Sequence, residues 1–231
     1  MIKLKEKIIK FAKKLNDRNL SPLRSGNLSI RVKLKQKTEG FFITPSGIKY
    51  DELSTKDIVF VSLKGEYNKK GLEPSSEWRF HQDIYLNKKS CKAIVHAHSM
   101  SATALSTHRV NIPAFHYMVA IAGGIDIKCA QYATFGTRQL SNSIVKALKE
   151  RTACLIANHG QIAYGGSLDE AFELAEEIEN ISKQYILARQ LGKPNILTLN
   201  QMEKVLNKFK NYKKKFIYIG VCNANLAIKW L

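Results

Sequence analysis

Apolar residues recur along the chain at two different spacings, which predict helices in some segments and strands in others. From residue 4 to residue 15 they lie four, three and four positions apart, the spacing of one face of an amphipathic helix. From residue 28 to residue 32 every second residue is apolar, the alternation of a half-buried strand. The same reasoning predicts strands at residues 41–44, 58–61, 93–98 and 153–158, and helices at residues 75–87, 138–151 and 168–190.

The predicted strands and helices interleave, which is typical of an α/β fold. Several neighbouring strands are joined by loops too short to hold a crossover helix, so these neighbours must be antiparallel. We therefore expect an α/β fold with a mixed, largely antiparallel sheet covered by helices on both faces. A chain of 231 residues is short enough for one core, and residues 1–231 are expected to form a single domain.

Composition narrows the class of protein. Hydrophobic residues make up 45% of the chain and charged residues 24%, which disfavours disordered and fibrous classes. No segment has the roughly 20 consecutive apolar residues of a membrane-spanning helix, and the lysine-rich first 15 residues do not resemble a secretory signal. The four cysteines lie far apart without metal-binding spacing. We expect a soluble, cytoplasmic protein with reduced thiols and no membrane partner.

The formal net charge of +18 is compatible with nucleic-acid binding, with attraction of an anionic substrate, or with a lysine-rich composition of no special purpose. Lysines occur along the whole chain, and only residues 208–215 cluster them with aromatic residues. No recognised nucleic-acid-binding motif accompanies the charge. Nucleic acid is therefore the disfavoured partner.

Histidines supply the strongest chemical signal. His96 and His98 are two positions apart in a predicted strand, so both imidazoles leave the same face of the sheet. Such a pair also occurs as ordinary hydrogen-bonding residues, but His159 follows another predicted strand and could complete a site with three protein ligands and one open position. This set suggests zinc. Three further histidines have ordinary structural explanations and are left out of the site: His81, His108 and His116.

Small polar residues near a predicted helix start suggest an anion site. Ser75 and Ser76 offer hydroxyl groups beside the free backbone N–H groups of that helix start. Glu77 follows in the expected first turn, where an acid also simply complements the helix dipole. Residues 26–27 and 46–47 form two more small-residue loops, each of which alone is typical of an ordinary turn.

Seven motifs occur in the following order along the chain: SGNLSIR, ITPSGIKY, EPSSEWRFH, VHAHS, HYMVAIAGG, YATFGTRQLS and ANHG. Together they resemble the class II aldolase and epimerase family, and within it the L-fuculose-1-phosphate aldolases. The resemblance extends from the first predicted helix to about Lys210. The C-terminal tail from about residue 214 does not share it.

The resemblance implies a zinc ion held by His96, His98 and His159, with Glu77 as the general acid/base that can also approach the metal. It implies a substrate phosphate pocket in the small-residue loops. That pocket consists of Asn27, Ser46, Gly47, Ser75 and Ser76. Ser46 stands where the family typically has threonine, a change that keeps the hydroxyl group.

The resemblance further implies that active sites lie at subunit interfaces of a homotetramer. Tyr117 would come from a neighbouring subunit and protonate the leaving aldehyde oxygen. Phe135, Phe209 and Tyr212 would contact the aldehyde end of the substrate.

The implied reaction is zinc-dependent retro-aldol cleavage of L-fuculose 1-phosphate, a small-molecule sugar phosphate, to dihydroxyacetone phosphate and L-lactaldehyde. One alternative is a related sugar-phosphate 4-epimerase or dehydratase, which shares the histidines but uses other acid/base groups. Another is a catalytically silent binding module on the same fold, as in the head domain of adducin. The three histidines and Glu77 favour an enzyme over the silent module.

Overall fold

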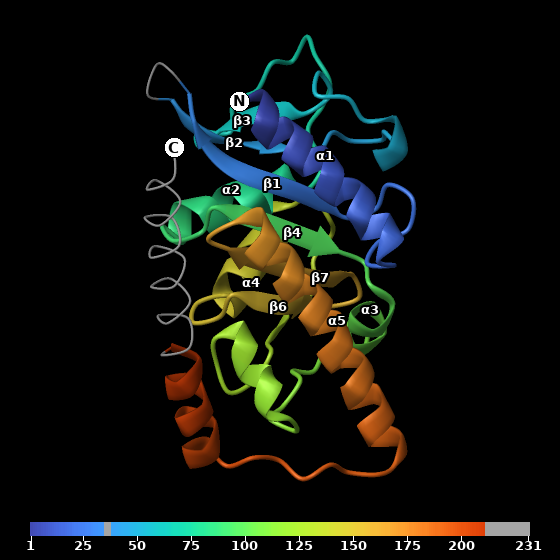
Figure 1. The fold of residues 1–231 in the computed structure, drawn as a ribbon, viewed down its shortest axis with the longest axis vertical. Coiled ribbons are helices and arrows are strands. Elements are labelled where there is room, and N and C mark those ends of the chain that lie inside the picture. Colours follow the sequence, from blue (N-terminus) through green and yellow to red (C-terminus); the bar gives the residue numbers. More distant parts are fainter. Residues whose placement is uncertain (35–37, 211–231) are drawn as a thin grey trace, which may run out of the picture.

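The computed structural model describes residues 1–34 and 38–210, which form one seven-stranded sheet (Figure 1). Its strands are β1 (Asn27–Lys33), β2 (Glu39–Ile43), β3 (Val59–Ser62), β4 (Ala93–Ala97), β5 (Cys129–Ala130), β6 (Ala153–Ile156) and β7 (Gly160–Gly165). They lie in the order β3-β2-β1-β4-β7-β6-β5, and every pair is antiparallel except β5 with β6. The predicted mixed, largely antiparallel sheet is confirmed.

Helices cover both faces of the sheet, as predicted. The helical elements are α1 (Ile2–Asp17), η1 (Tyr50–Glu52), α2 (Trp78–Asn87), α3 (Met100–Ser106), η2 (Tyr117–Ala122), α4 (Arg138–Ala147) and α5 (Leu168–Gln190). Residues 199–210 are also helical. The core on one face contains residues of α1, α3 and α5, whereas the core on the other face contains residues of α2 and α4. Figure 1 shows α1 and α5 together on the near side of the sheet.

The period of each element explains which face it buries. In α1 the apolar stripe buries Ile8, Phe11 and Leu15, and the Phe11 ring packs edge-on against Phe172 of α5 with 5.2 Å between centroids. Burying each such side chain contributes about 1.5–3 kcal/mol. The start of α5 is fixed by Ser167, whose side chain accepts a hydrogen bond from the backbone N–H of Glu170.

Strand β1 separates apolar residues from polar ones. Leu28, Ile30 and Val32 point into the core beneath α1 and α5. Asn27 and Ser29 are also buried, but alternation places them on the opposite face, the face covered by α2. A strand in the middle of the sheet thus carries two fully buried polar residues, which need hydrogen-bonding partners.

The elements that were not predicted include β7, α3 and η2. Strand β7 was missed because the six-residue segment GQIAYG contains two glycines and polar Gln161, yet every residue except the last is buried. Its residues pair with both β4 and β6. Pairing partners on both sides, which the local sequence does not specify, make this segment a central strand.

The helix predicted to begin at Ser75 begins at Trp78 instead. Pro74 and Ser75 are held outside the helix, because Pro45 and Pro74 form a β-bridge and the Ser75 N–H donates to the Thr44 carbonyl at 3.0 Å, and Ser76 and Glu77 form a turn. Glu77 is consequently the N-cap residue rather than a member of the first turn. The expected helix boundary was therefore wrong by about one turn.

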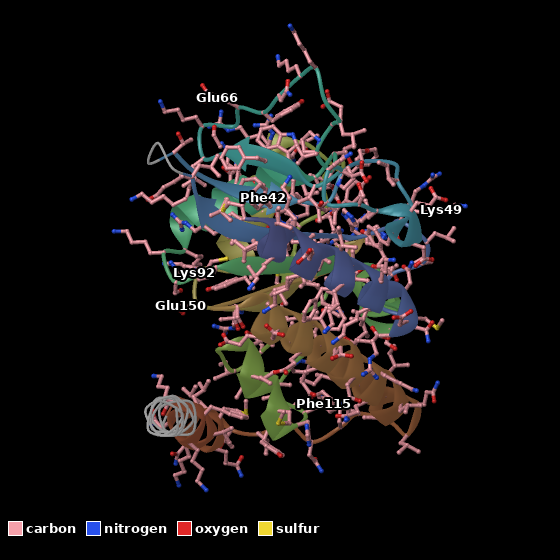
Figure 2. The ribbon with its side chains drawn as sticks, turned by 45° about the horizontal axis from the view of Figure 1, so that its top comes forward. Phe42, Lys49, Glu66, Lys92, Phe115 and Glu150 are labelled. Atoms are coloured by element: carbon pink, nitrogen blue, oxygen red, sulfur yellow. The ribbon has the colours of Figure 1, made fainter. Side chains whose placement is uncertain are left out.

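No helix within the described ranges is long and apolar enough to cross a membrane. Figure 2 shows nitrogen-tipped side chains projecting around the outline of the molecule in that view, Lys49 and Lys92 among them. The described cysteines Cys91, Cys129 and Cys154 carry free thiols. Cys222 and the C-terminal tail lie outside the described residues.

Candidate active site

Three histidines and one carboxylate meet beside the end of β4. His96 is in β4, His98 follows that strand, His159 lies between β6 and β7, and Glu77 caps α2. His96 Nε2 is 2.9 Å from His98 Nε2 and 3.1 Å from Glu77 Oε2. His159 Nε2 is 3.1 Å from Glu77 Oε1, and one potential ligand atom from each of the four residues lies within 4.8 Å of all the others. The structure brings together the three histidines singled out in the sequence and adds Glu77 to them.

A tight turn between β6 and β7 brings His159 close to the end of β4. Asn158 adopts the left-handed conformation with φ of 54°. Gly160 runs so close to β4 that a Cβ atom there would lie 2.4 Å from the Ala97 carbonyl oxygen and 3.2 Å from His98 Cδ2. Only glycine fits this approach without moving the backbone.

The donor set fits a divalent metal ion. His96 Nδ1 lies 2.8 Å from the Gln161 carbonyl oxygen and must donate to it, so whenever this ring is neutral its Nε2 lone pair faces the Glu77 carboxylate. Glu77 Oε1 is buried and makes no hydrogen bond, although His159 Nε2 lies 3.1 Å away. Two facing acceptors and an unsatisfied carboxylate oxygen are unfavourable alone, and a shared cation would stabilise both. Ligand atoms around a tetrahedral zinc lie roughly 3.3 Å apart, and three of the atom pairs here are 2.9 to 3.1 Å apart.

Burial and neighbouring charges control protonation in this group. Burial opposes ionisation of Glu77, but interactions with His96 and His159 outweigh it and hold its pKa well below the ordinary value. A bound cation would act in the same direction. Burial, with His96 and His159 nearby, lowers the pKa of His98 to about 3, so His98 is neutral, the form that binds metals.

The small-residue loops converge on this group and form the walls of one cleft. Ser46 N–H donates to the Glu73 carbonyl at 3.0 Å, and Arg24 Nη1 donates to the Gly47 carbonyl at 3.1 Å. These bonds tie the three loops together around a cleft of about 480 Å³. The five residues of the expected phosphate pocket all line it: Asn27, Ser46, Gly47, Ser75 and Ser76.

Of the described residues that were expected at the aldehyde end or at the interface, Phe135 lines the cleft, and Phe209 and Tyr117 do not. Phe135 lines the cleft and is 65% exposed. Phe209 is partly buried against the core beneath α1 and α5 and does not line the cleft, and Tyr212 lies outside the described residues. Tyr117, at the start of η2, is half exposed and is also absent from the described lining of the cleft.

The cleft is also lined by residues that the sequence did not single out, among them Arg24, Tyr132 and Asn158. Arg24 directly precedes the Ser25-Gly26-Asn27 loop, and Tyr132 stacks beneath the Arg109 guanidinium at 5.6 Å. Arg109 Nε in turn donates to Asn158 Oδ1 at 2.7 Å. A basic residue next to a small-residue loop was the available signal for Arg24.

The three histidines excluded from the metal group are absent from it within the described residues. His81 is fully buried on α2, and burial lowers its pKa to about 3. Its Nε2 lies 2.5 Å from Asn27 Oδ1, so His81 contacts a cleft residue directly. Sequence reasoning treated it as ordinary and missed this connection.

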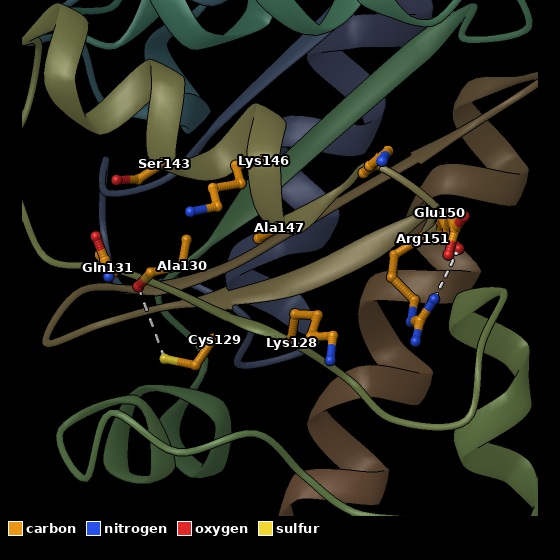
Figure 3. Close-up of a pocket in the computed structure, with 10 residues that line it drawn as sticks. Lys128, Cys129, Ala130, Gln131, Ser143, Lys146, Ala147, Glu150 and Arg151 are labelled. Atoms are coloured by element: carbon orange, nitrogen blue, oxygen red, sulfur yellow. Dashed lines mark hydrogen bonds between the residues drawn. The ribbon is translucent and has the colours of Figure 1, made fainter. Parts of the chain in front are cut away.

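A second cleft of about 460 Å³ is lined by four basic residues: Lys128, Lys146, Lys149 and Arg151 (Figure 3). Lys128 and Arg151 line it, yet each forms an ion pair at 2.7 Å with Asp126. It holds no group of potential metal ligands among the described residues. Among the described residues, the group of potential metal ligands therefore belongs to the histidine-lined cleft.

Comparisons with known proteins identify the family of this chain. Residues 6–186 match the family described as Class II Aldolase and Adducin N-terminal domain. The chain is 44% identical to a 5-methylthioribulose-1-phosphate/5-deoxyribulose-1-phosphate aldolase of Rhodospirillum rubrum, over 91% of this chain and 93% of that protein. It is 40% identical to an L-fuculose phosphate aldolase of Escherichia coli, over 91% of this chain and 95% of that protein.

Solved structures give the same result. An L-fuculose 1-phosphate aldolase structure superposes with a TM-score of 0.85 at 40% sequence identity and covers 91% of this chain and 97% of the other. The fold, the cluster of three histidines and a glutamate, and identities of 40% and 44% along most of the chain point the same way. The chain belongs to the class II aldolase and adducin N-terminal domain family and is a metal-dependent aldolase.

Proposed function

We propose that this aldolase uses zinc to cleave a ketose 1-phosphate to dihydroxyacetone phosphate and a short aldehyde. The observation that carries the proposal is the shared cleft, in which a nitrogen-rich metal group and three small-residue loops face the same space. A ketose 1-phosphate needs both, because its phosphate and its ketose oxygens are only a few bonds apart. L-Fuculose 1-phosphate is the first candidate substrate.

A second candidate class is 5-methylthioribulose 1-phosphate with 5-deoxyribulose 1-phosphate. It is favoured by the 44% identity to an aldolase named for these sugars, compared with 40% to the L-fuculose phosphate aldolase of Escherichia coli. All three sugars release an aldehyde with an apolar end. The exposed Phe135 ring and the Tyr132 ring at the cleft suit such an end.

His96, His98 and His159 would hold the zinc, with Glu77 able to approach it. A divalent cation held there acts as a Lewis acid on the ketose oxygens, where negative charge develops when the carbon–carbon bond breaks. Three imidazoles suit zinc better than magnesium or calcium, which prefer oxygen ligands.

Glu77 would transfer the proton at the carbon next to the carbonyl. After cleavage that carbon carries the electron pair of the broken bond, and protonating it yields dihydroxyacetone phosphate. Oε1 has no hydrogen-bond partner, and Glu77 lines the cleft, so a carboxylate oxygen is available to a substrate.

The small-residue loops would bind the phosphate. The Ser46, Ser75 and Ser76 hydroxyls and the Asn27 amide offer neutral donors, and Arg24 at the cleft adds a positive charge. Gly47, with φ of +79°, allows the turn that brings this backbone to the cleft.

Tyr117 would serve the active site of a neighbouring subunit in a homotetramer. In cleavage the sugar hydroxyl beyond the broken bond must lose a proton, and in synthesis the aldehyde oxygen must gain one. Tyr117 would exchange that proton in both directions. Its half-exposed ring and its absence from the described lining of its own cleft are compatible with a role in another subunit.

Location of the protein in the cytoplasm remains a prediction.

A substrate panel tests the proposal. Metal-loaded protein is incubated with the 1-phosphates of L-fuculose, 5-deoxyribulose and 5-methylthioribulose, and with L-fuculose as the unphosphorylated control. Dihydroxyacetone phosphate is measured by its enzymatic reduction with NADH. We expect release from at least one phosphate ester and none from the free sugar. No release from any ester would refute the proposal, and the ratio of kcat/KM values selects the substrate.

A further inference from the structure

A continuous row of buried polar side chains leads from the active site into the core beneath α2. Glu77, His81 and Tyr85 follow one another at intervals of four residues, which places them on one face of the helix and its cap. Asn27 and Ser29 are two residues apart on β1 and share the face that α2 covers. The four-residue spacing along the helix matches the two-residue spacing along the strand, so each of these helix side chains lies opposite a polar side chain of β1.

Every neighbour in this row is within hydrogen-bond distance of the next. Tyr85 Oη is 2.7 Å from Ser29 Oγ, which is 2.7 Å from His81 Nδ1. His81 Nε2 is 2.5 Å from Asn27 Oδ1, and Asn27 Nδ2 is 3.0 Å from Glu77 Oε2. The side chains of Ser29, His81 and Tyr85 are completely buried. These three side chains are therefore shielded from bulk solvent.

The chemistry of the last contact fixes the direction of all the others. An ionised carboxylate only accepts hydrogen bonds, so the Asn27 amide nitrogen must face Glu77 and the amide oxygen must face His81. His81 Nε2 therefore donates its proton to Asn27. A neutral imidazole then has a lone pair on Nδ1, so the Ser29 hydroxyl donates to His81 and accepts from Tyr85. Each group donates toward the active site.

We propose that His81, as a neutral imidazole protonated on Nε2, is a positioning residue that locks the Asn27 amide with both N–H groups facing the active site. The reversed amide would place its oxygen 3.0 Å from the Glu77 carboxylate, where the two would repel. The lock fixes one oxygen of Glu77 and leaves the other, Oε1, for the metal or the substrate.

The same lock sets the direction of the Ser75 hydroxyl. Ser75 Oγ accepts from Asn27 Nδ2 at 3.0 Å and from the Glu77 backbone N–H at 3.4 Å. With its lone pairs engaged, Ser75 must direct its own proton elsewhere, and it lines the cleft. His81 thereby prepares Ser75 to donate to an anion, a consequence that rests on the proposed phosphate role of this loop.

Two variants of the same residue separate positioning from simple core filling. In glutamine the amide nitrogen follows Cβ by the same number of bonds as Nε2 in histidine, so His81→Gln keeps a donor to Asn27. In asparagine the amide matches Nδ1 instead, so His81→Asn keeps a partner for Ser29 and leaves Asn27 without its donor. Both variants bury one neutral amide, which makes them matched controls for each other.

Kinetics and phosphate binding test the lock on metal-loaded protein. We expect His81→Asn to lower kcat/KM by about tenfold or more and to weaken competitive inhibition by inorganic phosphate by about threefold or more, while His81→Gln retains most of both properties. Metal content should be equal in the two variants. Equal losses in both, or losses that only follow the melting temperature, would overturn the positioning role.

Histidine nitrogen NMR tests the tautomer without any substrate. We expect the wild-type protein to show one histidine as the neutral Nε2–H form with a slowly exchanging proton, and this signal to disappear in His81→Gln. A protonated ring or the Nδ1–H form at His81 would overturn the lock. If the wild-type protein neither cleaves a ketose 1-phosphate nor binds phosphate, the proposed function fails, and the tautomer still decides the lock.

Discussion

Replacing Glu77 by glutamine isolates proton transfer from the other duties of this side chain. The carboxylate is 6% exposed and has three polar neighbours near 3 Å: Asn27 Nδ2, His96 Nε2 and His159 Nε2. Glutamine has nearly the same volume. Its oxygen can still accept from Asn27, and its amide group can take the place of the second carboxylate oxygen near His159. The change therefore removes the charge and the proton acceptor while the packing remains.

The magnitude follows from which contacts survive. Three imidazoles remain to hold the metal, so metal content is expected to stay close to that of the wild type. KM should change little, because the phosphate-binding loops are untouched. Loss of a positioned acid or base typically lowers turnover by about 10²–10⁴-fold, which corresponds to roughly 3–5 kcal/mol in the activation free energy.

The assay measures kcat by release of dihydroxyacetone phosphate, together with metal content by elemental analysis. A second measurement follows exchange of a hydroxymethyl hydrogen of dihydroxyacetone phosphate with D₂O in the absence of aldehyde, which reports the proton transfer alone. Both rates should fall together. Glu73→Gln is the matched control, because Glu73 belongs to the same loop, is exposed and contacts Tyr67 rather than the metal group. Turnover and exchange within about fivefold of wild type would refute the assignment of Glu77 as the acid/base.

Three further predictions concern the metal, the assembly and stability. Dialysis against a chelator should abolish cleavage and lower the melting temperature, with recovery on adding Zn²⁺, because the metal group combines the buried Glu77 and His96 with two partly buried histidines; full activity in verified metal-free protein would contradict this. Co-refolding Tyr117→Phe with Glu77→Gln should give partial activity if Tyr117 acts across an interface, and verified mixed tetramers without activity would exclude it. Asp126→Asn should lower the unfolding free energy by roughly 1–3 kcal/mol near neutral pH, because Asp126 pairs with Arg151 and Lys128 at 2.7 Å. Burial opposes the charge on Asp126, but these partners lower its pKa in the folded state below 3.8. The difference in unfolding free energy between the wild type and Asp126→Asn should therefore disappear as the pH falls from about 6 through the folded-state pKa of Asp126. Urea denaturation at several pH values measures this difference.

Elements with a clear hydrophobic period were predictable because the spacing of their apolar residues determines which face is buried. The stripe of α1 and the alternation of β1 each place apolar residues on one face, and the structure buries those faces. Strand β7 has no such pattern, since glycine, glutamine and tyrosine are interspersed in it and all but its last residue are buried. Its identity depends on pairing with β4 and β6, which no local window of sequence contains.

The members of the metal group also differ in how far local sequence predicts their place. His96 and His98 were recognisable because their spacing on a strand fixes a shared direction, and His159 was recognisable because it follows a strand. Glu77 gained its place through a break in regular structure: the bridge of Pro45 to Pro74 delays the start of α2 and leaves Glu77 as its cap. A propensity argument favours an earlier helix start and cannot include that bridge, because its two residues are far apart in the sequence.

His81 shows why a residue can look ordinary in the sequence and still belong to the active site. Its local context is an amphipathic helix, and a histidine there is usually a buried hydrogen-bonding residue. Its importance comes from the register of two elements: β1 pairs with β4 so that Asn27 lies beside His96, and α2 lies over that face so that His81 meets Asn27. The same register brings Asn27 to Glu77. A shift of β1 by one residue would turn Asn27 and Ser29 to the opposite face, separating Glu77 from its amide donor and leaving His81 buried without partners. The buried polar row therefore ties the pairing of the central strands to the geometry of the catalytic carboxylate.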